Sequence, residues 1–136
     1  MKILILGAGA VGGYWGARLH QAGVDVTFLL RAARSEKVRR DGLVVKSARG
    51  DAVLPVKVVT GGGEGGPYDV VVLACKAYDL ESAIASIAPA VGANTTIVPM
   101  LNGHAHFATL DARFGAARVA GGLARISGML GPNGEI

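Results

Sequence analysis

Cysteine is nearly absent from this 136-residue chain, where Cys75 is the only one. A single cysteine excludes an internal disulfide and makes a reducing compartment, the cytoplasm, the default expectation. Aromatic residues are scarce as well, at 5%, so the stacking side chains typical of nucleic-acid binding are missing. No apolar run approaches the roughly 18 residues that span a bilayer. We therefore expect a soluble protein with neither a membrane segment nor a nucleic-acid partner.

The net charge and the histidines exclude fewer classes of function than the scarcity of cysteine and aromatic residues does. The net charge of +4 is modest, and scattered basic residues suit an anionic small molecule as readily as a nucleic acid. Lys2 and the apolar residues after it imitate a secretory signal, but glycines and Arg18 soon interrupt them, which predicts an untargeted protein. His104 and His106 form a His-x-His pair without a third ligand cluster. We expect solvated or helix-N-terminal histidines and no metal site.

Aliphatic runs alternate with helical patterns along the whole chain, which is 51% hydrophobic. The runs predict strands at Ile3–Leu6, Val24–Leu30, Asp69–Cys75, Thr95–Met100 and Val119–Leu123. Helices are predicted between them: one with the inward face Val11, Trp15, Leu19 and Ala22, one at Ser35–Arg40, one carrying Leu80, Ile84 and Ile87, and one at His104–Phe114 with Phe107, Leu110 and Phe114 inward. This alternation indicates a single α/β domain over residues 1–136 with a mostly parallel sheet and helices on both faces.

Two segments interrupt the alternation. Residues 42–59 contain two apolar-rich runs around the turn Arg49-Gly50-Asp51, which predicts a hairpin or two short strands. Residues 61–67, GGGEGGP, predict a flexible surface loop that packs against nothing.

The first strand runs directly into Gly7-Ala8-Gly9-Ala10-Val11-Gly12, a G-x-G-x-x-G pattern. The pattern is weak alone, but between a strand and a helix it is typical of dinucleotide-binding, doubly wound Rossmann domains. There Gly7 would permit a tight turn, Gly9 would let a pyrophosphate approach the backbone, and Gly12 would let helix and strand pack closely. The helix N-terminus offers free N–H groups to the phosphates. The alternative is a glycine-rich turn that binds nothing.

Arg31 ends the second strand, nineteen residues after Gly12 (31 − 12). NAD-binding domains carry an acid at about this distance, which holds the ribose 2′-hydroxyl. A guanidinium there instead pairs with the 2′-phosphate of NADP(H), and Arg34 could assist. A solvated arginine at a strand end is the alternative.

Several motifs together resemble a known family. GAGAVGGYWGARL, LLR, GLVVKSARGD, VLACKAYDL and MLNG, in that order, look like the cofactor-binding half of ketopantoate reductases (2-dehydropantoate 2-reductases). The resemblance implies an NADPH-dependent reductase that converts ketopantoate, a 2-oxo acid, to pantoate for coenzyme A synthesis. It further implies that Lys76 and Asn102, which follow two strands, lie near nicotinamide and substrate, contacting the substrate carboxylate or the ribose. A snorkelling surface lysine and an Asn-Gly turn are the alternatives.

The family also has a helical C-terminal domain that supplies a catalytic lysine as general acid, and none of it is present here. We therefore expect this chain to be a piece or a stand-alone fragment that binds cofactor and is inactive alone. Two other functions remain open: a related reductase with a different 2-oxo acid substrate, and a nucleotide-sensing regulatory Rossmann module. A homodimer is left open too.

Overall fold

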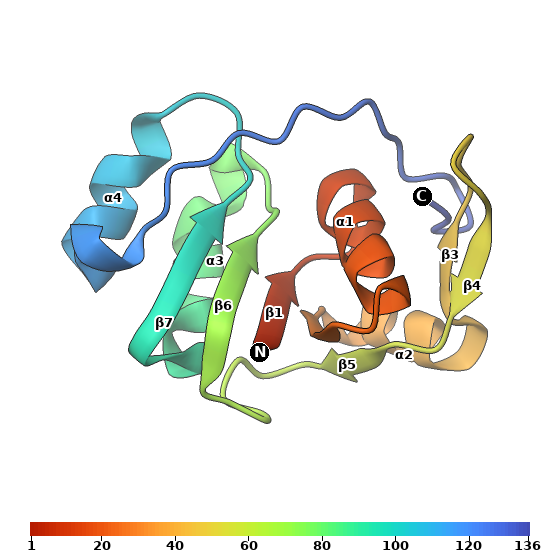
Figure 1. The fold of residues 1–136 in the computed structure, drawn as a ribbon, viewed down its shortest axis with the longest axis horizontal. Coiled ribbons are helices and arrows are strands. Elements are labelled where there is room, and N and C mark those ends of the chain that lie inside the picture. The colour runs from red at the N-terminus through yellow and green to blue at the C-terminus, as the bar shows by residue number, and fades with distance from the viewer.

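The computed structural model describes residues 1–136 and consists of one sheet, a hairpin and surrounding helices (Figure 1). The strands are β1 (Lys2–Leu6), β2 (Asp25–Leu29), β3 (Leu43–Val45), β4 (Ala52–Leu54), β5 (Lys57–Val59), β6 (Tyr68–Leu73) and β7 (Val91–Pro99). The helices are α1 (Ala10–Gln21), α2 (Ala32–Asp41), α3 (Leu80–Ile87) and α4 (Ala105–Phe114), with short 3₁₀ turns at Ala77–Asp79, Ala88–Ala90 and Ala116–Arg118. No helix combines the length and apolar character that crossing a bilayer requires.

Five parallel strands form the sheet in the order β5-β2-β1-β6-β7. The chain builds outward from β1 in both directions, so the order reverses between β1 and β6 and the sheet is doubly wound. Ile3 and Ile5 point into one buried cluster with Ala17 of α1, whereas Leu4 points into a second cluster with Ile84 of α3. Strand β1 is therefore covered on both faces, which explains its unbroken aliphatic run. The predicted α/β Rossmann-type fold is confirmed.

The inward face of α1 was predicted only in part: Leu19 packs against the cluster that contains Ile3 and Ile5, but Trp15 does not face inward. Its buried residues are Gly12, Gly13, Gly16 and Ala17, whereas Trp15 is 41% exposed. A Cβ on Gly16 would collide with the Phe28 ring of β2. The helix lies so close to the sheet that only small residues fit between them, and the large apolar side chains are displaced to its flanks.

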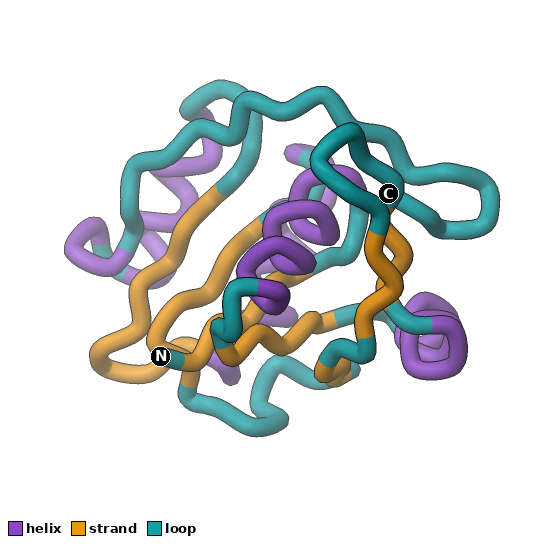
Figure 2. Tube along the Cα trace, turned by 45° about the vertical axis from the view of Figure 1, so that its right-hand side comes forward, coloured by secondary structure: helices purple, strands orange, loops and turns teal.

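The predicted last strand, Val119–Leu123, does not form. Only Val119 makes a single bridge, to Ile97 of β7, and Leu123 is 71% exposed. The chain then crosses the molecule in an irregular path and returns to the hairpin of β3 and β4 (Figure 2). There Ile136 is buried, its N–H donates to the carbonyl of Val44, and its carbonyl accepts from the N–H of Lys46.

Two further predictions need correction. The loop 61–67 does pack: the Glu64 carboxylate accepts hydrogen bonds from the N–H groups of Thr60 and Gly61, and Gly62 is buried. On α4, Leu110 is fully buried as predicted, but His106 lies beside it in the core and is only 5% exposed. His106 and Leu110 are four residues apart and share one helix face, which leaves Phe107 half-buried. His104 is exposed, as predicted.

Candidate dinucleotide-binding site

The carboxyl ends of the central strands meet around the glycine loop. The Gly7 N–H donates to the carbonyl of Leu29 at the end of β2 (3.1 Å), and the Ala74 N–H donates to Leu6 at the end of β1 (3.3 Å). These bonds extend the parallel ladder past the regular strands. They place the ends of β1, β2 and β6 side by side at the reversal of strand order, where open α/β sheets bind ligands.

The glycines of the loop have distinct structural roles. Gly7 has φ +94°, a backbone conformation that side chains disfavour. A Cβ on Gly12 would collide with the Gly7 carbonyl oxygen and lie 2.8 Å from the Cβ of Ala74, so this glycine permits the close approach of α1 to the sheet. A Cβ on Gly9 would meet no atom within 4 Å. Open space therefore lies beside the backbone of Gly9, which is the N-cap of α1.

No side chain caps the N-terminus of α1. The first N–H groups of a helix have no partner within the helix and carry partial positive charge. Ala10 and Val11 belong to this first turn, and Ala8, within the loop, is buried. The loop therefore leaves both room and unpaired donors for a phosphate group.

A crevice of about 500 Å³ opens from this loop. Its lining includes the buried Leu29 and Leu30 and combines apolar and polar side chains. The remaining lining residues are Leu6, Gly7, Ala8, Gly9, Arg31, Arg34, Thr60, Cys75, Asp79, Ser82, Ala83, Ser86 and Leu130. An apolar cleft with a polar, cationic rim suits a nucleotide, which has a flat base and charged phosphates.

Arg31 stands at the rim of this crevice as the N-cap residue of α2, and its side chain is 86% exposed. Its Nη2 lies 3.6 Å from Oδ1 of Asp79. At this distance and exposure the pair is weak, so the guanidinium can turn toward a ligand. Asp79 was not among the site residues predicted from the sequence; the only signal was its place in the CKAYD segment after a central strand.

Arg34 lines the same crevice from the first turns of α2. Its Nη2 donates to the carbonyl of Ala8 in the glycine loop (3.1 Å) and to that of Gly134 (2.7 Å). Partial burial lowers the pKa of this guanidinium, which still remains charged at neutral pH. The crevice therefore has two cations on its α2 side.

Lys76 and Asn102 lie apart from this crevice. Lys76 follows β6 and Asn102 follows the edge strand β7, and both residues are exposed. The Met100 N–H donates to the carbonyl of Leu73, which holds the two strand ends together. No hydrogen bond or ion pair joins Lys76 to Asn102. The structure thus places them at the carboxyl ends of the strands, as it does the glycine loop, and both side chains are open to solvent.

Cys75 lines the crevice and is half-buried, and burial raises the pKa of its thiol. His106 has no partner for its buried Nε2, and burial lowers its pKa. No cluster of three His, Cys, Asp or Glu side chains is arranged to hold a metal ion.

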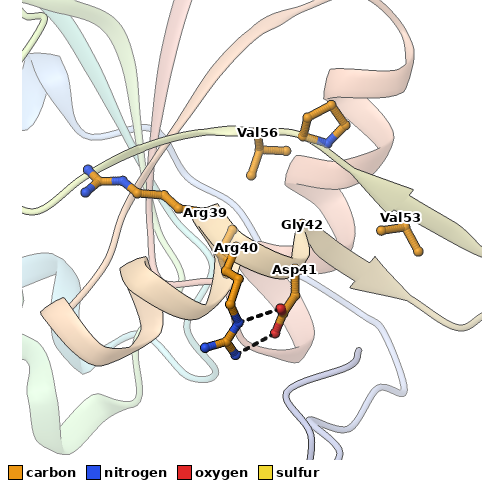
Figure 3. A pocket seen from close by; sticks show the side chains of 8 residues that line it. Arg39, Arg40, Asp41, Gly42, Val53 and Val56 are labelled. Atoms are coloured by element: carbon orange, nitrogen blue, oxygen red, sulfur yellow. Dashed lines mark hydrogen bonds and ion pairs between the residues drawn. The ribbon is translucent and has the colours of Figure 1, made fainter.

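A second cavity, of about 360 Å³, lies at the far end of α2 (Figure 3). Arg40 and Asp41 form a bidentate pair at its edge, with N–O distances of 2.7 and 2.9 Å, and this bonding lowers the pKa of Asp41 to about 2. The carboxylate is thereby occupied, and the other lining residues include Val53, Pro55 and Val56. This cavity lacks the glycine loop and the strand ends that mark the first one.

A family model described as ketopantoate reductase PanE/ApbA matches residues 3–136. The chain belongs to the ketopantoate reductase family. It is 43% identical over all 136 residues to "Uncharacterized oxidoreductase YkpB" of Bacillus subtilis, of which it spans 45%. It superimposes with a TM-score of 0.93 on 2-dehydropantoate 2-reductase from Geobacter metallireducens, at 39% identity, covering 99% of this chain and 45% of that one.

A more distant relative is a D-mandelate dehydrogenase solved with NADH and anilino(oxo)acetate. It has a TM-score of 0.86 and 25% identity, over 99% of this chain and 44% of that one. The chain therefore spans less than half the length of each of these three relatives.

Proposed function

We propose that this chain is the NADPH-binding domain of a 2-oxo acid reductase that converts ketopantoate to pantoate. The observation that carries the proposal is the placement of Arg31 and Arg34 at the rim of the crevice that begins at Gly9. A diphosphate bridge at the loop would meet unpaired N–H groups, and a 2′-phosphate at the rim would meet the Arg31 guanidinium, whose pair with Asp79 is weak. Family membership supports the reaction class.

In this proposal the loop residues Gly7, Ala8, Gly9, Ala10, Val11 and Gly12 hold the diphosphate through their backbone and through the N-terminus of α1. The open space beside Gly9 fits such a group, and so does the absence of a side-chain cap. Arg31 pairs with the 2′-phosphate, for which its planar guanidinium offers two donors. Arg34 adds positive charge beside it.

Lys76 and Asn102 are proposed to act at the substrate end of the site. NADPH supplies the hydride when it is bound. The Lys76 ammonium would bind the 2-oxo acid carboxylate or the ribose hydroxyls, and the Asn102 amide can donate and accept toward the same groups. The Lys76 ammonium has no competing ion pair in the structure.

The reduced carbonyl becomes an alkoxide that needs a proton and a dry cleft. Both Lys76 and Asn102 face solvent, so the strand ends by themselves do not form such a cleft. We propose that a helical C-terminal domain of the family type provides the general acid, and that residues 1–136 bind cofactor but turn over slowly alone. The single, half-buried Cys75 is compatible with a cytoplasmic enzyme.

A related NADH-dependent 2-oxo acid reductase is the second candidate, because the relative named a D-mandelate dehydrogenase was solved with NADH. Calorimetric titration with NADPH and NADH distinguishes the two candidates. We expect tighter NADPH binding, and Arg31→Ala should weaken it about 10- to 100-fold while changing NADH binding less than about twofold. Arg40→Ala, on the same helix but outside the crevice, is the matched control.

Two results would refute the proposal. One is the absence of binding by either nucleotide. The other is an equal loss of NADPH and NADH affinity in Arg31→Ala, which would assign the guanidinium to a part that both nucleotides share. Rapid ketopantoate reduction by residues 1–136 would refute the need for a second domain.

A further inference from the structure

Asp79 faces Arg31 across the rim of the crevice. The two residues come from different elements: Arg31 begins α2 after strand β2, and Asp79 precedes α3 after strand β6. Their closest charged atoms are 3.6 Å apart, and both residues line the crevice. Asp79 is the less exposed partner, with 37% of its side chain accessible against 86% for Arg31. The carboxylate is therefore the more fixed member of the pair.

The side chain of Asp79 is not used to cap its own helix. Asp79 is the N-cap residue of α3, a position where aspartate usually accepts a hydrogen bond from an N–H of the first turn. No such bond forms here. The Ser82 hydroxyl instead donates to the backbone carbonyl of Asp79 (2.9 Å). The carboxylate remains available to the crevice and to Arg31.

We infer that Asp79 is a specificity-determining residue that weakens NADPH binding relative to NADH by competing with the 2′-phosphate for Arg31. The inference rests on the proposed function of the crevice. Before Arg31 can pair with the phosphate it must leave Asp79, and the carboxylate then stands near a second anion. NADH carries no 2′-phosphate and meets neither penalty. Competition for the guanidinium is the larger effect, because the pair is only 3.6 Å apart and screening by water at the open rim grows with the separation of the charges.

Asp79→Asn tests this inference by removing the charge alone, since an N-cap position accepts asparagine as well as aspartate. We expect NADPH to bind about two- to fivefold tighter, which is the upper part of the range for an exposed ion pair, while NADH binding stays unchanged or weakens. Glu81→Gln is the matched control: Glu81 is exposed two residues further on, carries the same charge, and does not line the crevice. It should change NADPH affinity less than about twofold.

A double-mutant cycle with Arg31→Ala then separates competition from general repulsion. When Arg31→Ala is already present, the gain from Asp79→Asn should fall below about twofold. Four outcomes would each overturn the inference. Two concern Asp79→Asn itself: NADPH binding that is unchanged or weaker, and a gain in NADH affinity equal to the gain in NADPH affinity. The other two are an equal gain in NADPH affinity from Glu81→Gln, and a full gain from Asp79→Asn in the protein that already carries Arg31→Ala. These outcomes differ from failure of the proposed function, in which the unaltered chain binds neither nucleotide.

Discussion

Two glycines of the same loop, Gly12 and Gly9, should respond differently to substitution by alanine. At Gly12 the added methyl would collide with the backbone carbonyl of Gly7 and lie 3.2 Å from Cγ2 of Ile5. A backbone atom cannot rotate out of the way, so α1 must move off the sheet. Overpacking of this kind costs about 1–3 kcal/mol. A cost of about 2 kcal/mol lowers Tm by roughly 6–10 °C in a domain of this size.

At Gly9 the same methyl would meet nothing within 4 Å, and φ is −88°, which alanine adopts readily. The remaining cost is the preference for glycine over alanine at an N-cap, under about 1 kcal/mol. The methyl would nevertheless occupy the space proposed for the diphosphate. NADPH affinity should therefore fall about tenfold or more while the fold is retained.

Urea unfolding followed by circular dichroism, with calorimetric NADPH titration of the same preparations, measures both quantities. Gly12→Ala should lower the unfolding midpoint and the affinity together, and Gly9→Ala should lower the affinity alone. Wild-type stability in Gly12→Ala would contradict the close helix–sheet approach. Wild-type NADPH affinity in Gly9→Ala would contradict the placement of the diphosphate beside that residue.

Three further outcomes follow from groups with shifted pKa values. Burial lowers the pKa of His106 below its value in the unfolded chain. Stability should therefore fall as the pH drops through about 6.5, because the unfolded state then binds a proton that the folded state does not. Thermal unfolding of His106→Leu should show a smaller loss of stability at acid pH, and His104→Gln is the control. Arg40→Gln should raise the pKa of Asp41 from about 2 toward its usual 3.8, as followed by NMR titration; an unchanged value would mean that Arg40 is not its cause. Burial raises the pKa of the Cys75 thiol, so a thiol reagent should modify it more slowly than free cysteine, and more slowly still with NADPH present; no protection would place the nucleotide elsewhere.

Local patterns predicted most of the elements. Strand β1 and the turn after it could be predicted because an aliphatic run indicates a buried strand and glycines indicate a tight turn. Both signals come from residues that are neighbours in the sequence. Errors arose where long-range packing overrides periodicity. Trp15 has the spacing of an inward-facing residue, yet Phe28 from the next strand occupies the space in front of Gly16, which no pattern within the helix reveals. Val119–Leu123 has strand composition, but it makes only one bridge to β7, at Val119.

Some residues of the candidate site could be predicted from the sequence, and others could not. The glycine pattern and the arginine at the end of the second strand could be found by counting along the chain. Asp79 is 48 positions from Arg31 (79 − 31), and only the folding of β6 beside β1 brings it to the same rim. The orphaned Nε2 of His106 likewise became visible only with the core around α4.

The sequence by itself determined the alternation of strands and helices and the backbone shape of the glycine loop, because both depend on neighbouring residues and on the steric freedom of glycine. The tertiary structure alone decided which face of α1 is buried and which charge stands opposite Arg31. Both depend on contacts between residues far apart in the chain, whose partners are set by the order of strands in the sheet.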